Sequence, residues 1–509
     1  MKLFRTEWMP LTLILLLASV LRLWNISEVP PALSTDELVN GYDAWCMSLS
    51  LHDHHGAFMP LMFESFGDWV SPVLTYLTIP FVKLFGLTPF AVRLPVALLG
   101  IAAVYLFFRL MKTLFNSSTT ALIGALCFAL APVMITTSRW AIPPSIVPFM
   151  LLLFLNTFFW ALKKASVSRF LLVAAAGVLV VYSYPVMKLF FPAWCAFLVL
   201  IYRKQLRWNM LPGALLFALC IAPLYYLSLR YPEIYNARFE NISIASTGEN
   251  PFTGFLKRYV QYLTPFFFFG GGDTFISHHV PGFGALPEVL AFFSYVGIVA
   301  VAAAGIGQLN FINQKVAQAL IAFLVLFAIP ASVTFHTYTT LRTLHGFLLM
   351  LIMAIAGIHF LLSQIRYSGL LSGTLAFLLL VNTLHFSNYY FGKYTADSRT
   401  VFHAGIKEVF TYLEKEGAAY DKITVNTNLK SENGLLMPYI YLLFYSRYNP
   451  ALLTKEMMTH TGKYYFEETG EEAWKDKPLL YSSDGGVNEK YNVYKRSETE
   501  LVVIRQVIP

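Results

Sequence analysis

The chain has 509 residues, of which 57% are hydrophobic and only 13% are charged. A soluble globular protein of this composition would lack the polar side chains needed to cover its surface, so we expect most of the chain to lie in lipid. The net charge of +8 is typical of basic cytoplasmic loops, and we interpret it as a sign of topology and not of nucleic-acid binding.

Apolar segments long enough to cross a bilayer follow one another along the chain. A crossing takes about 20 mainly apolar residues. The first segment lacks a small-residue cleavage site before Trp24, so we expect it to be retained as a span and not removed as a signal sequence. Clear segments begin near Met9, Leu94, Thr120, Ile146, Met210, Val289, Ala317, Leu344 and Leu370.

A further apolar stretch, 170–202, is interrupted at Tyr184-Pro185. Proline removes a backbone donor and breaks a helix, so this stretch predicts two short spans that form a hairpin. The sequence therefore predicts a mainly α, polytopic membrane protein with about eleven transmembrane helices.

The distribution of basic residues supports this count. With the N-terminus in the cytoplasm, every inner connection carries lysine or arginine, as the insertion bias requires. These residues are Arg109, Lys112, Lys163, Lys164, Arg169, Arg203, Lys204, Arg207, Lys315 and Arg366. The same topology places two long loops, 25–92 and 230–288, on the outer side of a plasma membrane.

The segment 391–509 differs in character from the transmembrane domain, 1–390. Charged residues return, and hydrophobic residues become periodic. The spacing of Phe402, Ile406, Val409, Phe410 and Leu413 predicts a helix that stops near Gly417. Alternation around Ile423 and Val425, around Tyr464 and Tyr465, and around Val502 and Ile504 predicts strands. We expect a small extracytoplasmic α/β domain.

Two adjacent acids, Asp36 and Glu37, follow the first span at the expected outer surface. Helix capping explains them equally well: Ser34 or Thr35 as the N-cap, with acids in the first turn favoured by the helix dipole. The functional alternative is a general base held close to lipid.

Few basic residues fall on the outer side, which draws attention to Arg139, Lys188 and Arg342. Each alone could extend toward lipid headgroups. Together, on separate turns of one face, they favour a shared anion site.

Several motifs occur in the order typical of a known group. Asp36-Glu37 is followed by Ser71-Pro72 with Tyr76, then by Phe85-Gly86-Leu87 and Arg93-Leu94-Pro95. Later motifs are Ser138-Arg139-Trp140-Ala141, Tyr184-Pro185, Gly272-Asp273 and Thr340-Leu341-Arg342. This order resembles the superfamily of protein O-mannosyltransferases and aminoarabinose transferases, which are C-type glycosyltransferases.

The resemblance implies a polyprenyl-phosphate-linked sugar as donor, the C-type glycosyltransferase fold, and Asp36 as the leading catalytic candidate with Glu37 second. Candidates for acceptor or loop contacts are Tyr42, Glu64, Asp68, Asp273 and His279. One departure concerns the aminoarabinose branch, which carries a further acid where this chain has Ile142-Pro143-Pro144.

No metal site is predicted. The chain contains histidine clusters at 52–55 and 278–279, but consecutive histidines rarely point at one ion. There is no Asp-x-Asp pair either. A monophosphate leaving group does not require a divalent ion, so we expect no required cofactor.

These observations favour an inverting membrane glycosyltransferase of the cell envelope, which moves a sugar from the lipid donor to an acceptor hydroxyl. The acceptor, a protein, a lipid or a glycan, stays open. The alternatives are a lipid-linked sugar carrier or flippase and an inactive scaffold. A carrier is less favoured, because the spans contain almost no ionisable groups.

Overall fold

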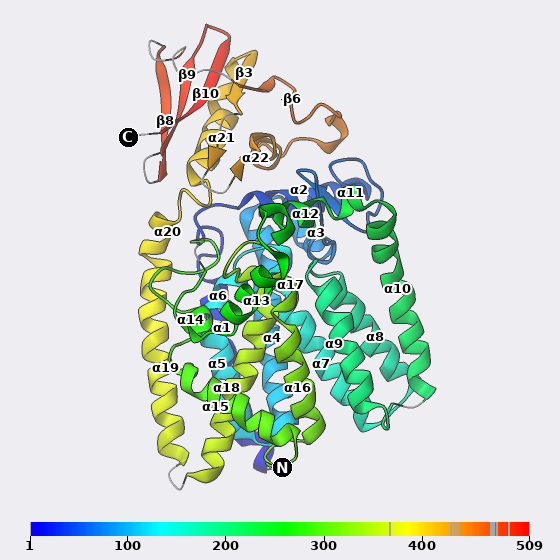
Figure 1. Ribbon diagram of the computed structural model, residues 1–509. Helices are drawn as coiled ribbons and strands as arrows, with labels where there is room; N and C mark the ends of the chain where they lie inside the picture. Colours follow the sequence, from blue (N-terminus) through cyan, green and yellow to red (C-terminus); the bar gives the residue numbers. More distant parts are fainter. Residues whose placement is uncertain are drawn as a thin grey trace.

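The computed structural model describes residues 2–507 except 207, 274, 366–367, 428–429, 432–433, 436, 469–473, 475–476 and 487–488. Arg207 and Arg366, two of the predicted inner basic residues, lie outside the described part. The chain is mostly helical: a helical bundle carries a layer of short elements at one end, and a small sheet domain stands above that layer (Figure 1).

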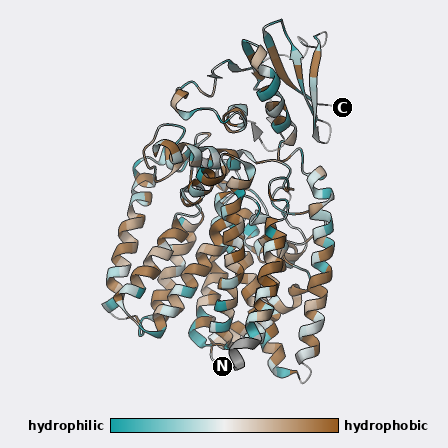
Figure 2. Cartoon of the chain, turned by 180° about the vertical axis from the view of Figure 1, so that it is seen from behind, coloured by the Kyte–Doolittle hydropathy of each residue, from teal (hydrophilic) through white to brown (hydrophobic). Residues whose placement is uncertain are grey.

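The bundle is built from long apolar helices. They are α1 (Lys2–Leu23), α4 (Pro89–Phe115), α5 (Ser118–Leu130), α7 (Val147–Lys163), α8 (Val167–Val181), α9 (Met187–Tyr202), α10 (Leu211–Arg230), α15 (Leu290–Gly305), α16 (Gln314–Leu326), α18 (Leu344–Gln364) and α19 (Ser368–Phe391). Hydrophobic residues cover most of their length (Figure 2).

Six helical segments among the described residues are long and apolar enough to cross a membrane, and further apolar helices are shorter, at 10–17 residues. A multi-pass membrane protein is therefore confirmed, whereas the number of eleven spans stays a prediction. The break at Tyr184-Pro185 is confirmed, since α8 ends at Val181 and α9 begins at Met187.

Helix α18 lies at the centre of the bundle, with Leu344 to Ile358 buried. It packs against α15 through two glycines. A Cβ atom on Gly297 would overlap the Met353 carbonyl oxygen, and one on Gly357 would overlap the Phe293 carbonyl oxygen. Small residues let two helices approach closely in lipid, where packing and not water exclusion holds them together.

The end of the bundle opposite the N-terminus, here called the domain end, carries the connecting segments (Figure 1). After α1 come α2 (Thr35–Ser50), the hairpin of β1 (Phe63–Ser65) and β2 (Asp68–Val70), and α3 (Val73–Phe85). Later connections contain α6 (Pro132–Thr137), η1 (Pro143–Ile146), α11 (Pro232–Tyr235), α12 (Ala237–Ile242), η3 (Ile244–Thr247), α13 (Pro251–Tyr262), α14 (Pro265–Phe269), α17 (Ile329–Ser332) and η4 (Leu341–Thr343).

The segment after α19 folds around a sheet. Its helices are α20 (Lys393–Asp397), α21 (Ala404–Glu416) and α22 (Pro438–Tyr445), with the short turns η5 (Gly417–Ala419) and η6 (Pro450–Leu452). The strands are β3 (Lys422–Asn426), β6 (His460–Thr461), β7 (Tyr464–Glu467), β8 (Leu479–Gly486), β9 (Glu489–Lys495) and β10 (Glu500–Val507), in the order β6-β7-β3-β10-β9-β8. A separate short pair joins β4 (Lys430–Ser431) to β5 (Gly434–Leu435).

The predicted helix and strands of this segment are confirmed. Ile406, Val409, Phe410 and Leu413 are buried on α21, which is capped by Gly417, whereas Phe402 lies in the turn before the helix begins. The central strand β3 runs parallel to β7 and β10, and the remaining pairs are antiparallel. Helix α22 packs against α2, so this domain rests on the first connecting segment.

Candidate functional site

The site candidate begins at the first turn of α2. Ser34 is the N-cap: its hydroxyl accepts a hydrogen bond from the Glu37 backbone N–H, and its own N–H donates to Glu37 Oε2 at 2.9 Å. This reciprocal arrangement is a capping box. The capping interpretation of the two acids is therefore correct for Glu37, with Ser34 and not Thr35 as the cap.

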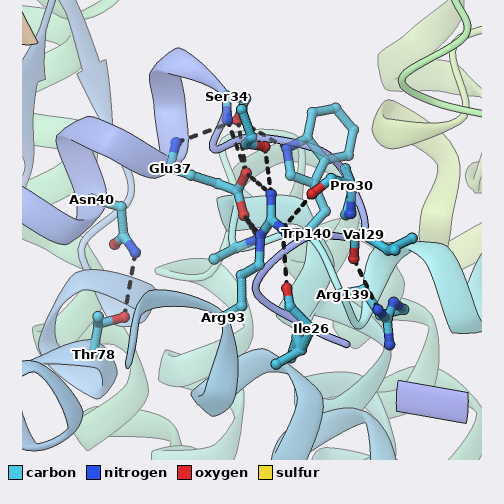
Figure 3. A network of polar contacts seen from close by, with 12 residues as sticks. Ile26, Val29, Pro30, Ser34, Glu37, Asn40, Thr78, Arg93, Arg139 and Trp140 are labelled. Carbon is cyan, nitrogen blue, oxygen red and sulfur yellow. Dashed lines mark hydrogen bonds and ion pairs between the residues drawn. The ribbon is translucent and has the colours of Figure 1, made fainter. Parts of the chain in front are cut away.

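Glu37 is fully buried and faces an equally buried arginine, Arg93 of α4 (Figure 3). Arg93 Nε donates to Glu37 Oε1 at 2.8 Å, and Arg93 Nη2 donates to Oε2 at 3.1 Å. The Ala141 backbone N–H also donates to Oε1 at 2.9 Å. Both carboxylate oxygens are therefore occupied, and Glu37 ties α2, α4 and the segment after Arg139 together.

Asp36 precedes Glu37 by one residue but is exposed. Consecutive residues of an α-helix are rotated by about 100° around the helix axis, so the carboxylates of Asp36 and Glu37 point in different directions. The two acids thus have different environments: Glu37 is buried among hydrogen-bond donors, and Asp36 is exposed at the surface.

Arg139, expected to bind the donor phosphate, is fully buried and bonded to the backbone. Its guanidinium donates to the carbonyl oxygens of Leu21 at 3.1 Å, Trp24 at 2.7 Å and Val29 at 2.9 Å. Figure 3 shows the last of these bonds. Because these carbonyls use the donors that a phosphate would need, the geometry does not favour a phosphate contact and gives Arg139 a structural role.

Lys188 and Arg342 are half-buried at the domain end. Arg342 Nη1 donates to the Thr334 hydroxyl at 2.6 Å, and Lys188 Nζ lies 3.9 Å from the Met62 sulfur. Within the described part of the chain, neither cation has a carboxylate within 4.0 Å. Both therefore keep donors for an anion.

Two of the loop candidates lie beside these cations. Asp68, at the start of β2, attracts the Lys188 charge. Asp273 is buried and accepts a hydrogen bond from the Thr340 N–H at 2.6 Å, just before the turn η4 that contains Arg342. Burial opposes ionisation of Asp273, but its bond to His278 and the backbone N–H donors hold its pKa below the ordinary value. Asp273 thus positions the Arg342 turn.

The other loop candidates have different partners. The Tyr42 hydroxyl donates to the Tyr448 carbonyl at 2.7 Å, which fixes the sheet domain to α2. Glu64 lies 3.9 Å from the His55 ring nitrogen, and His279 Nδ1 lies 3.1 Å from the Phe275 carbonyl oxygen. Among the described residues, no group of three or more histidine, cysteine, aspartate or glutamate side chains could hold a metal ion.

Sequence reasoning missed a second buried pair on the same loop. His54 Nδ1 and Asp43 Oδ1 are 2.5 Å apart, and both side chains are buried. Burial of the imidazole lowers its pKa, but the Asp43 carboxylate more than compensates, so the pKa of His54 is raised above 6.5. The histidine cluster at 52–55 was the available signal, but we considered it only as a metal ligand set.

The Asp43–His54 pair is expected to make stability depend on pH. Because the folded state holds the proton more tightly than the unfolded state, the contribution is fully present below about pH 6.5. It disappears as the pH rises through the raised pKa of His54. Thermal unfolding measured from pH 5 to 9 should show this loss in the wild type and not in His54→Gln. The exposed His52 provides the control, since His52→Gln should keep the wild-type pH profile.

The chain is similar in sequence to known mannosyltransferases. Residues 70–226 match the family described as dolichyl-phosphate-mannose-protein mannosyltransferase. YycA of Bacillus subtilis (strain 168), a mannosyltransferase by name, is 28% identical over 250 residues, which are 48% of this chain. The match covers only 33% of that relative's length.

Solved structures show the same fold. ArnT from Cupriavidus metallidurans bound to undecaprenyl phosphate has a TM-score of 0.55 at 14% identity, covering 87% of this chain and 85% of that one. The apo form of that ArnT has a TM-score of 0.54 at 14% identity, covering 86% and 84%. The archaeal oligosaccharyltransferase AglB from Archaeoglobus fulgidus, in complex with an inhibitory peptide and a dolichol-phosphate, has 0.53 at 13%, covering 87% and 64%. Together these matches confirm the resemblance to the C-type glycosyltransferases of the mannosyltransferase and aminoarabinose-transferase superfamily.

Proposed function

We propose that this protein is a membrane glycosyltransferase that moves a sugar from a polyprenyl-phosphate donor to an acceptor hydroxyl at the domain end of the bundle. One observation supports this most directly: of two adjacent acids, Glu37 is enclosed by Arg93 and backbone donors, while Asp36 is exposed. The first holds the turn in place, and the second lies at the surface of the domain end, where an acceptor can approach it.

In this mechanism Asp36 accepts the proton of the acceptor hydroxyl as its oxygen attacks the anomeric carbon. The bond from that carbon to the lipid phosphate breaks, and the phosphate leaves with the electron pair. A single displacement inverts the anomeric centre. We expect no required metal ion, since the leaving group is a monophosphate whose charge nearby cations can stabilise.

Lys188 and Arg342 are the residues proposed to receive that phosphate. Replacing either by methionine is expected to raise KM for the lipid donor by about tenfold or more, because a hydrogen bond to a charged group contributes about 1.5–3 kcal/mol. Steady-state kinetics at varied donor concentration measure this. Arg230, an exposed cation at the end of α10, is the matched control, and Arg230→Met should leave KM unchanged. Equal effects of all three variants would contradict a specific phosphate site.

The domain end is proposed to face the outside of the plasma membrane, with the N-terminus in the cytoplasm. The basic residues of the described connections at the other end, from Arg109 to Lys315, support this orientation. The sheet domain, fixed to α2 through Tyr42, would then stand beside the acceptor entrance.

The function is tested with purified full-length protein in lipid vesicles and a panel of radiolabelled polyprenyl-phosphate sugars. Protein, lipid and glycan acceptors are offered in parallel. Release of polyprenyl phosphate together with a labelled acceptor identifies the transferase and its substrates. Movement of labelled lipid between leaflets without any transfer would instead identify a carrier, and neither activity would indicate a scaffold.

A further inference from the structure

A second site candidate lies in the other half of the bundle, where α7, α8, α9 and α10 surround an apolar cavity. We call it the inner cavity. Its volume is about 140 Å³. Its walls include Phe158, Ala174, Gly177, Leu198, Leu206 and Phe217.

The cavity exists because α10 packs loosely. Only 11% of the hydrophobic window of this helix is buried. It approaches α8 at Gly213, where a Cβ atom would lie 2.5 Å from the Phe170 carbonyl oxygen. Figure 1 shows α10 at the edge of the bundle beside α8. A cavity at such an edge opens sideways toward lipid, and an apolar chain is the chemistry that fits its walls.

The end of the bundle next to the inner cavity is strongly basic. The connections α7–α8 and α9–α10 lie at the same end of the bundle as the N-terminus (Figure 1). They carry exposed or half-exposed cations, and residues 147–232 contain no aspartate or glutamate at all. These described cations are Lys163, Lys164, Arg169, Arg203 and Lys204. The charge is therefore uncompensated within this part of the sequence.

Two tryptophans at this end of the bundle indicate the level of the membrane surface. Trp208 is 84% exposed, and Trp160 stacks against the Arg169 guanidinium at 4.0 Å. Tryptophan is enriched where lipid headgroups meet the hydrocarbon layer. The cations therefore lie at headgroup depth, directly below the apolar walls.

We propose that the inner cavity binds an anionic glycerophospholipid. One acyl chain lies against the apolar walls, and the phosphate lies among Arg203, Lys204 and the cations of the α7–α8 connection. This site is separate from the proposed sugar-transfer site at the domain end. Its role is to hold α10 against the rest of the bundle.

Native mass spectrometry of the full-length protein tests this proposal, with phosphatidylglycerol, phosphatidylcholine and polyprenyl phosphate added separately. Each basic residue near a membrane surface favours an anionic lipid, so phosphatidylglycerol should bind about tenfold more tightly than phosphatidylcholine. Equal binding of these two lipids would overturn the proposal. Polyprenyl phosphate should not displace bound phosphatidylglycerol; complete displacement would assign the cavity to the donor and overturn it as well.

Variants locate the binding. Ala174→Trp fills the cavity, and Arg203→Gln with Lys204→Gln removes two charges at the surface without touching the core. Both should lose the preference for phosphatidylglycerol. The controls are Leu219→Trp, on the exposed side of α10, and Arg230→Gln, at its other end. If the charge variant folds and keeps the preference, the site is wrong. Sugar transfer is measured in parallel and should persist in all four variants.

Discussion

Asp36→Asn is expected to lower sugar transfer by about 10²- to 10⁴-fold, the range that a general base contributes. The amide cannot accept the acceptor's proton, but it has nearly the same size. Because Asp36 is exposed, the change should leave the free energy of unfolding within about 0.5 kcal/mol of the wild type. Single-turnover transfer and thermal unfolding of the same preparations measure both effects.

Measuring donor binding distinguishes the loss of the catalytic base from a general loss of structure. Asp36→Asn should bind the polyprenyl-phosphate sugar as the wild type does, since the phosphate is proposed to contact Lys188 and Arg342. Asp36→Glu keeps the carboxylate with a longer side chain and should retain part of the activity. If Asp36→Asn transferred sugar at the wild-type rate, the carboxylate would be only a helix-capping charge.

The largest effect on stability is expected at Glu37. Glu37→Gln leaves Arg93 charged and buried without its counter-ion, and breaking a buried pair on one side costs about 3–5 kcal/mol. The variant should unfold at a clearly lower temperature, measured in the same detergent as the wild type. Asp36→Asn, one residue away, is the matched control for loss of a carboxylate.

A second substitution distinguishes the structural role of Glu37 from a catalytic one. Arg93→Gln should destabilise the protein by a similar amount, and the double variant should lose less than the sum of the two, because neither charge is then left alone. Activity per folded molecule should fall only to the extent that the first turn of α2 loses its fixed position. A large loss of activity in Glu37→Gln at unchanged stability would make Glu37, and not Asp36, the base.

The sequence predicted the features that depend on local patterns. Hydrophobic length located the bundle helices, Tyr184-Pro185 located a hairpin, and the spacing from Phe402 to Leu413 located α21. The number of spans is harder to settle, because α5, α8, α9 and α15 are shorter than a full crossing. Whether a short helix crosses the membrane depends on its tilt and on the helices beside it, and hydropathy gives no information on either.

The site was predicted less completely, because burial of charged residues follows from contacts between distant segments. Arg93 and Arg139 occur in the recognised motifs, yet their partners lie up to 118 positions away, as in the bond from Arg139 to Leu21. The sequence around an arginine does not show whether its side chain donates to backbone carbonyls or faces a ligand. The same holds for Asp43 and His54: the histidine cluster at 52–55 drew attention to this segment, but it did not indicate which acid His54 would contact.

The arginine contacts also bear on how the protein is made. The segment that leads into the first turn of α2 is held by Arg93 through the Pro30 and Ala32 carbonyls, and by Arg139 through the Val29 carbonyl. During synthesis both arginines emerge from the ribosome well after that segment. The turn carrying Asp36 therefore cannot take its final position until the chain has been made as far as Arg139. Ordering of the proposed base thus depends on a residue 110 positions beyond the segment that it holds.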